Sequence, residues 1–508
     1  MTEFKKFYRK FASPFTLIWL VAFLGVTLGC AHKTVAQQPP PPPAAPSTSN
    51  DAKPGAAEAY PESKISSKEA EELFQQVDEI LKFASDDTGL PIKKQVKRRL
   101  TSRNEVEAYL QKNMAEDKDA QRLSRSQLVL KKFGLLPRDF DLQTFLVALL
   151  KEQVAGYYDP KTKTVNLLDW VGIEQQKPVM AHELTHALQD QSFGLERWMK
   201  EGDVDLDTKK DITSEDIERD EITTARQAII EGQAMVTLVN YMLAPTGQTV
   251  KDSPQVVEAL KQGMLTGTPD SVQFHNAPIF LKEALTFPYR YGLDFEAALL
   301  IKGGKTKAFY QTLINPPHNT RQIMEPQTYL AGEKIPPMPM PDFRKDLADY
   351  ERFDVGAMGE FDVAVLIDQY VGEDASHRLF PEWRGGYYYA ARPKGDPAGP
   401  LGLLYVSRWS TPEKASEFAA IYAKALSRRY KQVRESGIAA DKPEVRLEAL
   451  DSMTGKRLWT TEEGTVEIDV QDDIVFVSES FDEASTKLLE QDVLKTPVVK
   501  QEALNRKD

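Results

Sequence analysis

The residues His182, Glu183 and His186 form the pattern H-E-x-x-H in the middle of an otherwise mostly apolar segment, 180–188. Residues four positions apart share one face of an α-helix, so a helix here turns both imidazoles toward the same point. This spacing is typical of a helical zinc site with a glutamate beside the metal. Catalytic zinc sites usually have three protein ligands, so the fold has to bring the third from elsewhere in the chain. Two histidines that only pack on a helix face are the alternative.

Glu183 is the predicted catalytic residue of this pattern. A zinc ion lowers the pKa of bound water toward about 7 and polarises a substrate carbonyl. Glu183 would accept the water proton as general base and pass it to the departing amine as general acid. We therefore predict zinc-dependent hydrolysis of peptide bonds, with Zn²⁺ as the cofactor and a peptide or protein as the substrate. Hydrolysis of other amides or of esters would use the same residues.

A second motif, E-G-Q-A at 231–234, follows the segment HELTHALQDQ at 182–191. Together they resemble the gluzincin type of zinc metallopeptidase, in particular its secreted bacterial members. The resemblance covers about 143–329 and more faintly 382–409. It implies that Glu231 is the third zinc ligand, and that the catalytic domain is zincin-like. Other residues that contribute to the resemblance are Gly156–Pro160, Pro288, Tyr289, Gly292, Pro316, Pro317, Thr320 and Gln322.

The surroundings of Glu231 support the same role independently. It lies in an apolar helical stretch, 228–239, and shares a helix face with apolar residues, so its side chain is expected to point inward. Burying an unpaired carboxylate is costly, and a bound cation offsets that cost. Gly232 would let another helix pass close by, such as the one with the two histidines. The alternatives are an internal ion pair with Arg226 and two rival ligands, Asp190 and Glu221.

The order of helices and strands around the motif suggests a largely helical domain with a small sheet. The chain is expected to be mostly helical from a capping box at Ser66 and Glu69 onward. Residues 156–168 predict a β-hairpin with the turn Asp-Pro-Lys-Thr. Pro178 suits the first turn of the helix that follows. The charged stretch 196–220 is expected to be a solvated loop, with a lid over the site as the alternative.

The C-terminal part combines strands with helices and contains no motif of obvious chemistry. A helix is expected at about 358–371, and another begins after Ser410 with Glu413 as its capping partner. Alternating or apolar runs indicate strands between and after these helices. The predicted strands are 386–392, 403–409, 466–470 and 474–477.

The N-terminus has the pattern of an exported, lipid-anchored protein. Four basic residues precede an apolar run, 15–29, and Cys30 follows directly. This junction resembles the lipobox of bacterial lipoproteins, which implies a lipid on Cys30 and attachment to a membrane of the bacterial cell envelope. By the same resemblance, Ala31 after the cysteine would permit delivery to the outer membrane of a two-membrane bacterium, or a position that faces the periplasm. A cleaved signal without a lipid and an uncleaved anchor are the alternatives. Since Cys30 is the only cysteine, the chain forms no internal disulfide.

A chain of 508 residues exceeds what one hydrophobic core usually holds, so we expect more than one domain. The patterns above give the boundaries. We predict a signal peptide at 1–29, a lipidated cysteine and Pro-rich linker at 30–65, and a zincin-like metallopeptidase domain at 66–345. An α+β domain of unknown role follows at 346–508. The net charge of -12 provides no basic field, so nucleic acid is not an expected partner. The alternative function is a non-catalytic, zinc-binding envelope lipoprotein that binds other proteins.

Overall fold

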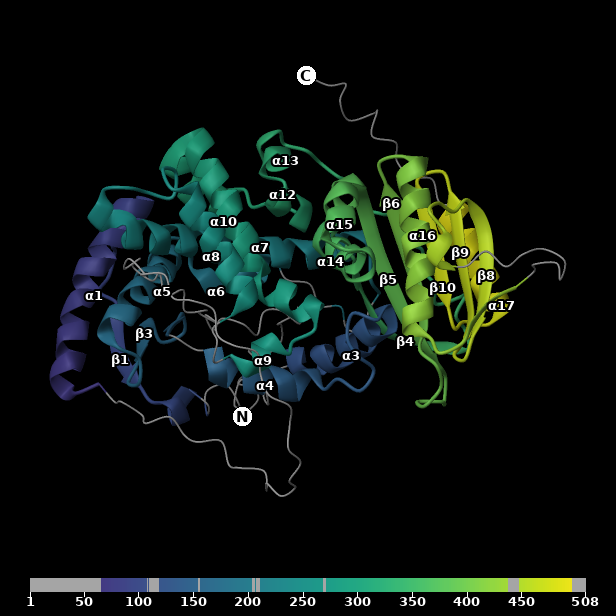
Figure 1. Ribbon diagram of the computed structural model, residues 1–508, viewed down its shortest axis with the longest axis horizontal. Helices are drawn as coiled ribbons and strands as arrows, with labels where there is room; N and C mark the ends of the chain where they lie inside the picture. The colour runs from purple at the N-terminus through teal and green to yellow at the C-terminus, as the bar shows by residue number, and fades with distance from the viewer. Residues whose placement is uncertain are drawn as a thin grey trace, which may run out of the picture.

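The computed structural model of this chain describes residues 65–106, 108, 118–153, 156–202, 206, 211–267, 271–436 and 447–495. The predicted signal peptide, Cys30 and nearly all of the Pro-rich linker lie outside the described residues. Among the helices that are described, none combines the length and the apolar character needed to cross a membrane. The described part is a mixed α+β structure, as predicted (Figure 1).

The first part of the chain contains a small sheet with the strand order β1-β3-β2. The predicted hairpin is confirmed, because β2 and β3 pair antiparallel with Tyr157 opposite Asn166. Strand β1 was not predicted, and it runs parallel to β3 in a region expected to be mostly helical. Its sequence, KRRLT, is short and mostly charged, so no alternation of apolar residues predicts a strand there. The bounds are β1 (Lys97–Thr101), β2 (Tyr157–Asp159) and β3 (Thr164–Leu168).

Helices form the rest of this part. The predicted capping box at Ser66 and Glu69 is confirmed at the start of α1. The α-helices are α1 (Ser67–Thr88), α3 (Lys118–Phe133), α4 (Leu142–Gln153), α5 (Ile173–Phe193), α6 (Leu195–Glu201), α7 (Ser214–Leu243), α8 (Pro254–Thr266), α9 (Val272–His275), α10 (Ile279–Thr306), α11 (Thr312–Ile314), α12 (Thr320–Met324) and α13 (Pro326–Leu330). A 3₁₀-helix, η1 (Ala244–Thr246), and a π-helix, η2 (Lys307–Gln311), complete this part.

Two boundaries differ from the prediction. Helix α5 begins at Ile173, so Pro178 lies inside it rather than in its first turn. The missing N–H of Pro178 costs the helix one internal hydrogen bond. The charged stretch at 196–220 is not one loop, because α6 covers its start and α7 begins at Ser214. A capping box formed by Thr213 and Asp216 fixes that beginning.

Helices α7 and α10 cross at a pair of glycines, Gly232 and Gly292. A Cβ atom on either residue would clash with the backbone of the other helix. The close approach predicted at Gly232 is therefore real, but the neighbour is α10 and not the histidine-bearing α5. The crossing holds residues near the middle of α10 close to Glu231, one position before Gly232.

The second part of the chain is a seven-stranded sheet with the order β4-β5-β6-β10-β9-β8-β7, in which all pairs are antiparallel. Helices α14 and α16 pack on one face, and α17 contacts β10 (Figure 1). The bounds are β4 (Tyr350–Ala357), α14 (Glu360–Val371), α15 (Glu373–Leu379), η3 (Phe380–Glu382), β5 (Trp383–Pro393), β6 (Gly402–Trp409), α16 (Pro412–Arg429), β7 (Val433–Glu435), η4 (Leu447–Ala449), β8 (Gly455–Thr461), β9 (Gly464–Gln471), β10 (Ile474–Glu479) and α17 (Glu483–Lys495).

The four strands and the helix at 358–371 predicted in this part are confirmed by β5, β6, β9, β10 and α14. Strands β4, β7 and β8 were not predicted. The residue that caps α16 is Thr411 and not Ser410, because the Thr411 side chain accepts a hydrogen bond from the backbone of Lys414.

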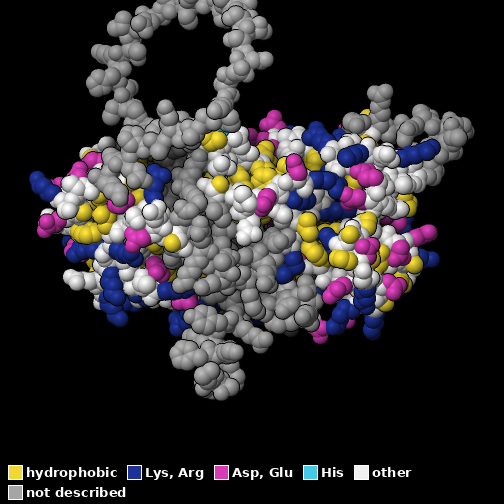
Figure 2. Space-filling view, turned by 90° about the horizontal axis from the view of Figure 1, so that it is seen from below, with side chains coloured by type: hydrophobic (Ala, Val, Ile, Leu, Met, Phe, Trp, Pro, Cys, Tyr) yellow, Lys and Arg dark blue, Asp and Glu magenta, His cyan; other side chains and the backbone are white. Residues whose placement is uncertain are grey.

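One apolar core connects the two parts. It contains Phe133 and Phe287 from the first part, and Phe361, Tyr405 and Leu426 from the second. The predicted domain boundary at 345/346 stays a prediction, but the chain on either side of it shares buried contacts. Figure 2 shows Lys and Arg interspersed with Asp and Glu on the face it displays, outside the grey residues.

Candidate metal centre

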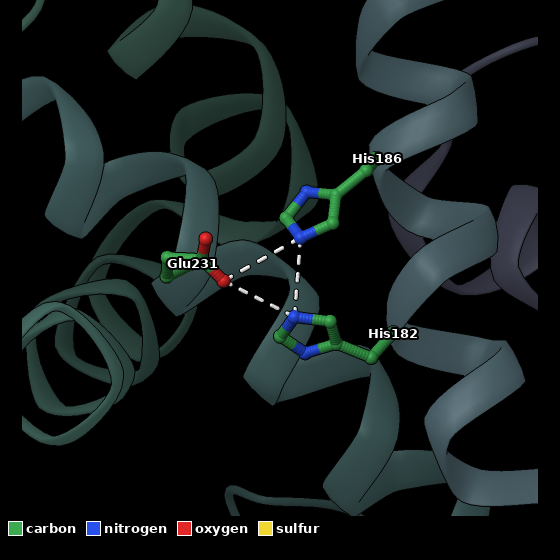
Figure 3. Close-up of side chains that lie close together, drawn as sticks. All are labelled: His182, His186 and Glu231. Carbon is green, nitrogen blue, oxygen red and sulfur yellow. Dashed lines mark hydrogen bonds and ion pairs between the residues drawn. The ribbon is translucent and has the colours of Figure 1, made fainter. Parts of the chain in front are cut away.

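His182, His186 and Glu231 converge at one point between α5 and α7 (Figure 3). The Nε2 atom of His182 lies 3.1 Å from Glu231 Oε2 and 3.1 Å from His186 Nε2. His186 Nε2 lies 3.4 Å from the same glutamate oxygen. The structure thus brings together all three predicted ligands.

Their placement follows from two buried helices. Helix α5 is buried along nearly its whole second half, so both histidines face the interior. Helix α7 is apolar around Glu231, whose side chain points inward as predicted and is 3% exposed. An ion pair between Arg226 and Glu231 is not present, since Arg226 stacks on Trp198 instead.

The two rival ligands lie elsewhere. Asp190 accepts hydrogen bonds from the Tyr158 hydroxyl and the Lys163 ammonium, and so ties the hairpin to α5. Glu221 accepts hydrogen bonds from the backbone and hydroxyl of Thr320. Neither carboxylate belongs to the group of side chains that could hold an ion, which among the described residues is His182, His186 and Glu231.

The three ligand atoms fit a cation in both chemistry and spacing. Two imidazole nitrogens and one carboxylate oxygen are a common ligand set of catalytic zinc sites. Zinc bonds of about 2.0 to 2.1 Å in a tetrahedral arrangement place ligand atoms about 3.3 Å apart. The separations of 3.1 to 3.4 Å agree with that value. The buried triad could therefore hold a metal ion without rearrangement of its helices.

A chain of amide side chains orients His186. Its Nδ1 atom lies 2.9 Å from Gln189 Oε1, so Nδ1 carries the proton and Nε2 is left to face Glu231 and His182. Gln189 donates to the Ile230 carbonyl and to Gln233 Oε1. Gln233 donates in turn to the carbonyl of Ala308. This network was not predicted, because it depends on how α5, α7 and η2 pack together.

Protonation in the cluster follows from burial and from the charges close by. Burial opposes the charge on Glu231, but the neighbouring His186 outweighs it and lowers the pKa of that carboxyl to about 2. Burial likewise opposes a charge on His186, but Glu231 outweighs it and raises the pKa of the imidazole to about 9. Burial lowers the pKa of His182. Without a cation, Glu231 and His186 therefore stabilise each other's charged forms, and a metal that binds has to displace a proton from the cluster.

Glu183 lies beside the triad but does not belong to it. Its Oε2 atom accepts a hydrogen bond of 2.7 Å from the backbone N–H of Tyr158 in β2. Its Oε1 atom is buried and has no hydrogen-bond partner among the described residues. Burial raises the pKa of this carboxyl to about 7. One oxygen is thus fixed by the sheet, while the other is left for a molecule that enters the site.

Tyr289 is a functional candidate to which the sequence assigned no role. Its ring centroid lies 6.3 Å from that of His182. Its hydroxyl is buried and has no partner among the described residues. Burial, together with the charges of Glu231 and Glu183, raises the pKa of this hydroxyl, which places it within the field of both carboxylates. The only sequence signal was its share in the family resemblance.

Comparison with known proteins does not assign the chain to a family. No protein-family model, no curated protein and no solved structure matches the chain. The gluzincin resemblance and the zincin-like fold therefore stay predictions. The centre itself is a buried pair of histidines and a glutamate that could hold a metal ion.

Proposed function

We propose that this protein is a zinc-dependent peptidase of the gluzincin type, with a zincin-like catalytic domain, attached by a lipid to the bacterial cell envelope. The observation that carries the proposal is the convergence of His182, His186 and Glu231 with Glu183 beside them. A zinc site that served only stability would be closed by four protein ligands, and three are found here among the described residues.

The chemistry divides between the metal and the chain. Zinc, when bound, would lower the pKa of a water molecule and polarise the substrate carbonyl. The chain holds the ligands in place: the Gln189 amide fixes the tautomer of His186, and helix packing fixes Glu231. Both histidines and the glutamate are excluded from solvent, which strengthens their electrostatic interactions.

Proton transfer is the proposed task of Glu183. The Tyr158 N–H holds Oε2, so the carboxylate plane is oriented before substrate arrives. The unpartnered Oε1 can accept a proton from the attacking water and later donate it to the departing amine. Burial, which raises the pKa of this carboxyl, favours a group that takes up and releases a proton in one cycle.

Tyr289 is proposed to donate a hydrogen bond to the oxygen that becomes negative as the carbonyl is attacked. A buried hydroxyl without a partner costs about 1 to 3 kcal/mol of desolvation, and a substrate oxygen would offset that cost. Tyr289→Phe is expected to lower kcat about 10²- to 10³-fold, with zinc content unchanged.

The matched control for Tyr289 is Tyr291→Phe, which removes a hydroxyl from the same helix. Tyr291 packs against Phe287 and Arg290 and not against the triad. Its substitution should leave kcat near the wild-type value. Equal losses in both variants would assign Tyr289 a structural role only.

The proposed function is tested by zinc analysis and a peptide-library digest of the purified protein. We expect about one zinc per chain and cleavage that stops with a chelator and returns with added Zn²⁺. Bound zinc without cleavage of any peptide would instead favour the non-catalytic zinc-binding lipoprotein. Cleavage confined to esters or non-peptide amides would change the substrate class but keep the mechanism.

The envelope location is tested separately at Cys30. A Cys30→Ala protein is expected to lose acyl labelling and to leave the membrane fraction. Labelling and membrane retention that both survive the substitution would contradict the lipid anchor.

A further inference from the structure

Glu296 on α10 is a buried carboxyl group that the proposed mechanism does not use. It follows Gly292 by four positions, so it lies one turn beyond the α7–α10 crossing, on the face of α10 that is turned toward α7 (Figure 1). Its side chain is fully buried, and neither of its oxygens accepts a hydrogen bond from a described residue. Because a buried carboxyl group without a partner is costly, its retention needs a reason.

The surroundings of Glu296 keep it uncharged. Among the described residues, no Lys, Arg or His forms an ion pair with it, and it does not belong to the group of side chains that could hold a metal ion. Burial raises the pKa of this carboxyl well above its usual value, and Gln233 is the one described side chain whose hydrogen bonding acts on it. Glu296 is therefore a neutral carboxylic acid with one O–H to donate.

The hydrogen bonds of Gln233 show what it still lacks. Its Nε2 donates to the Ala308 carbonyl at 2.8 Å and to Thr312 Oγ1 at 3.0 Å, which accounts for both amide hydrogens. The Thr312 hydroxyl donates its own hydrogen to the Ala308 carbonyl, so its oxygen acts as the acceptor. Gln233 Oε1 accepts one hydrogen bond, from Gln189 Nε2 at 2.8 Å. An amide oxygen can accept two, so one lone pair of Gln233 is left.

Only one kind of hydrogen bond can therefore join Gln233 and Glu296. An ionised Glu296 would bring an acceptor to an amide whose two hydrogens are already used. A neutral Glu296 supplies the donor that the remaining lone pair of Gln233 Oε1 lacks. The same bond gives the buried carboxyl group its partner.

The orientation of Gln233 matters at the metal centre because it determines the orientation of Gln189. Gln233 Oε1 accepts from Gln189 Nε2, so Gln189 presents its own oxygen to Nδ1 of His186. The ring proton then resides on Nδ1, and Nε2 is free to bind a cation. A rotated Gln189 amide would present its N–H groups to Nδ1 and move the ring proton to Nε2, where it would block the metal.

We propose that Glu296 is a positioning residue of the metal centre, which donates a hydrogen bond to Gln233 Oε1 and through Gln189 fixes the metal-binding tautomer of His186. This role rests on the proposed zinc site and extends it from α5 and α7 to α10. It explains why a carboxyl group is retained where α10 is otherwise apolar and packs on α7.

The test compares two substitutions that differ in their ability to donate. Glu296→Gln keeps an N–H donor at the same place and should retain wild-type zinc affinity. Glu296→Met has a similar length but no donor, and is expected to weaken zinc affinity about 3- to 10-fold. That loss should stay below the about 10- to 100-fold expected for Gln189→Leu, which removes the direct partner of His186. Competition with a chromophoric chelator measures all three.

Thermal unfolding of the metal-free protein distinguishes positioning from structural support. Glu296→Met replaces a desolvated acid by an apolar group, so its melting temperature should equal or exceed that of the wild type. Glu283→Met is the matched control, because it removes a mostly buried carboxylate of α10 that pairs with Arg290. This control should unfold at a lower temperature, since Arg290 loses its partner, and should bind zinc as the wild type does.

Two spectroscopic measurements test the hydrogen bond itself. The infrared C=O stretch of a neutral carboxyl group is separate from that of a carboxylate, and the wild type should lose one such band in Glu296→Gln. In zinc-loaded protein with ¹⁵N-labelled histidine rings, the Nδ1 proton of His186 should exchange with solvent faster in Glu296→Met than in the wild type. Glu296→Asp, whose shorter side chain withdraws the acid from Gln233, replaces Glu296→Met if that variant does not fold.

The outcomes separate this role from the proposed function. Equal zinc affinity and equal proton exchange in the wild type and Glu296→Met overturn the positioning role and leave the zinc site intact, as does an equal loss of affinity in Glu296→Gln and Glu296→Met. A lower melting temperature of Glu296→Met with unchanged zinc affinity assigns Glu296 to structure alone. A wild-type protein that binds no zinc overturns the proposed function and the positioning role with it.

Discussion

Replacing Glu183 with Gln is expected to lower the rate of peptide hydrolysis about 10²- to 10⁴-fold while zinc stays bound. The amide has nearly the shape of the carboxylate, and its oxygen can still accept the hydrogen bond from the Tyr158 N–H. It cannot accept the proton of an attacking water. Because Glu183 forms no hydrogen bond to His182, His186 or Glu231 in the structure, the ligand set should be unaffected. Single-turnover kinetics and metal analysis on the same preparation measure both effects.

The control for this variant is Glu174→Gln on the same helix. Glu174 is exposed and pairs with Lys177, and an exposed ion pair of this kind contributes little to stability. Hydrolysis should therefore stay at the wild-type rate. Wild-type turnover in Glu183→Gln would remove Glu183 from the mechanism, whatever the zinc content.

The parts of the site that could be predicted are those set by one helix at a time. The i, i+4 spacing fixes how His182 and His186 lie relative to each other in any helix. Glu231 could be predicted to point inward because its neighbours along α7 are apolar. The resemblance to gluzincins then implied that Glu231 binds the same metal ion as the two histidines. The structure brings the side chains of all three residues together.

The parts that escaped prediction depend on contacts between elements far apart in the chain. Gln189 and Gln233 have ordinary helical surroundings in the sequence, and only the packing of α5 on α7 makes them one hydrogen-bonded chain. Gly232 correctly indicated that another helix passes close by, but the sequence did not show whether that helix is α10 or α5. The unpaired hydroxyl of Tyr289 is likewise a property of the packed state.

The second part of the chain shows the same division. Strands β6 and β10 are buried apolar runs next to each other in the middle of the sheet, and their residues could be predicted from the sequence. Strand β7 is an edge strand and β8 is its neighbour, and both are more polar, so a sequence pattern does not predict which strands they pair with. The core shared by the two parts of the chain could not be predicted from the sequence, because an apolar residue does not show which other part of the chain it contacts.

Removing Glu231, the proposed third ligand, should have the largest effect on metal binding. Glu231→Ala is expected to weaken zinc affinity by more than about 100-fold, since substitutions of residues that only support a ligand already cost about 10- to 100-fold. Two histidines on one helix would remain, without the negative charge that offsets the cation's loss of hydration. Zinc affinity is measured by competition with a chromophoric chelator, and circular dichroism verifies that the helices are retained.

Glu221→Ala supplies the matched control for this ligand, because it removes a second buried carboxylate from the same helix. Glu221 bonds Thr320 and lies ten positions, about 15 Å along the axis, before Glu231. Its loss deletes hydrogen bonds and buried volume but no ligand, so zinc affinity should stay near the wild-type value. The comparison thereby distinguishes a ligand from a residue that only stabilises α7. A Glu231→Ala protein that still binds zinc tightly and cleaves peptides would exclude Glu231 from the metal centre.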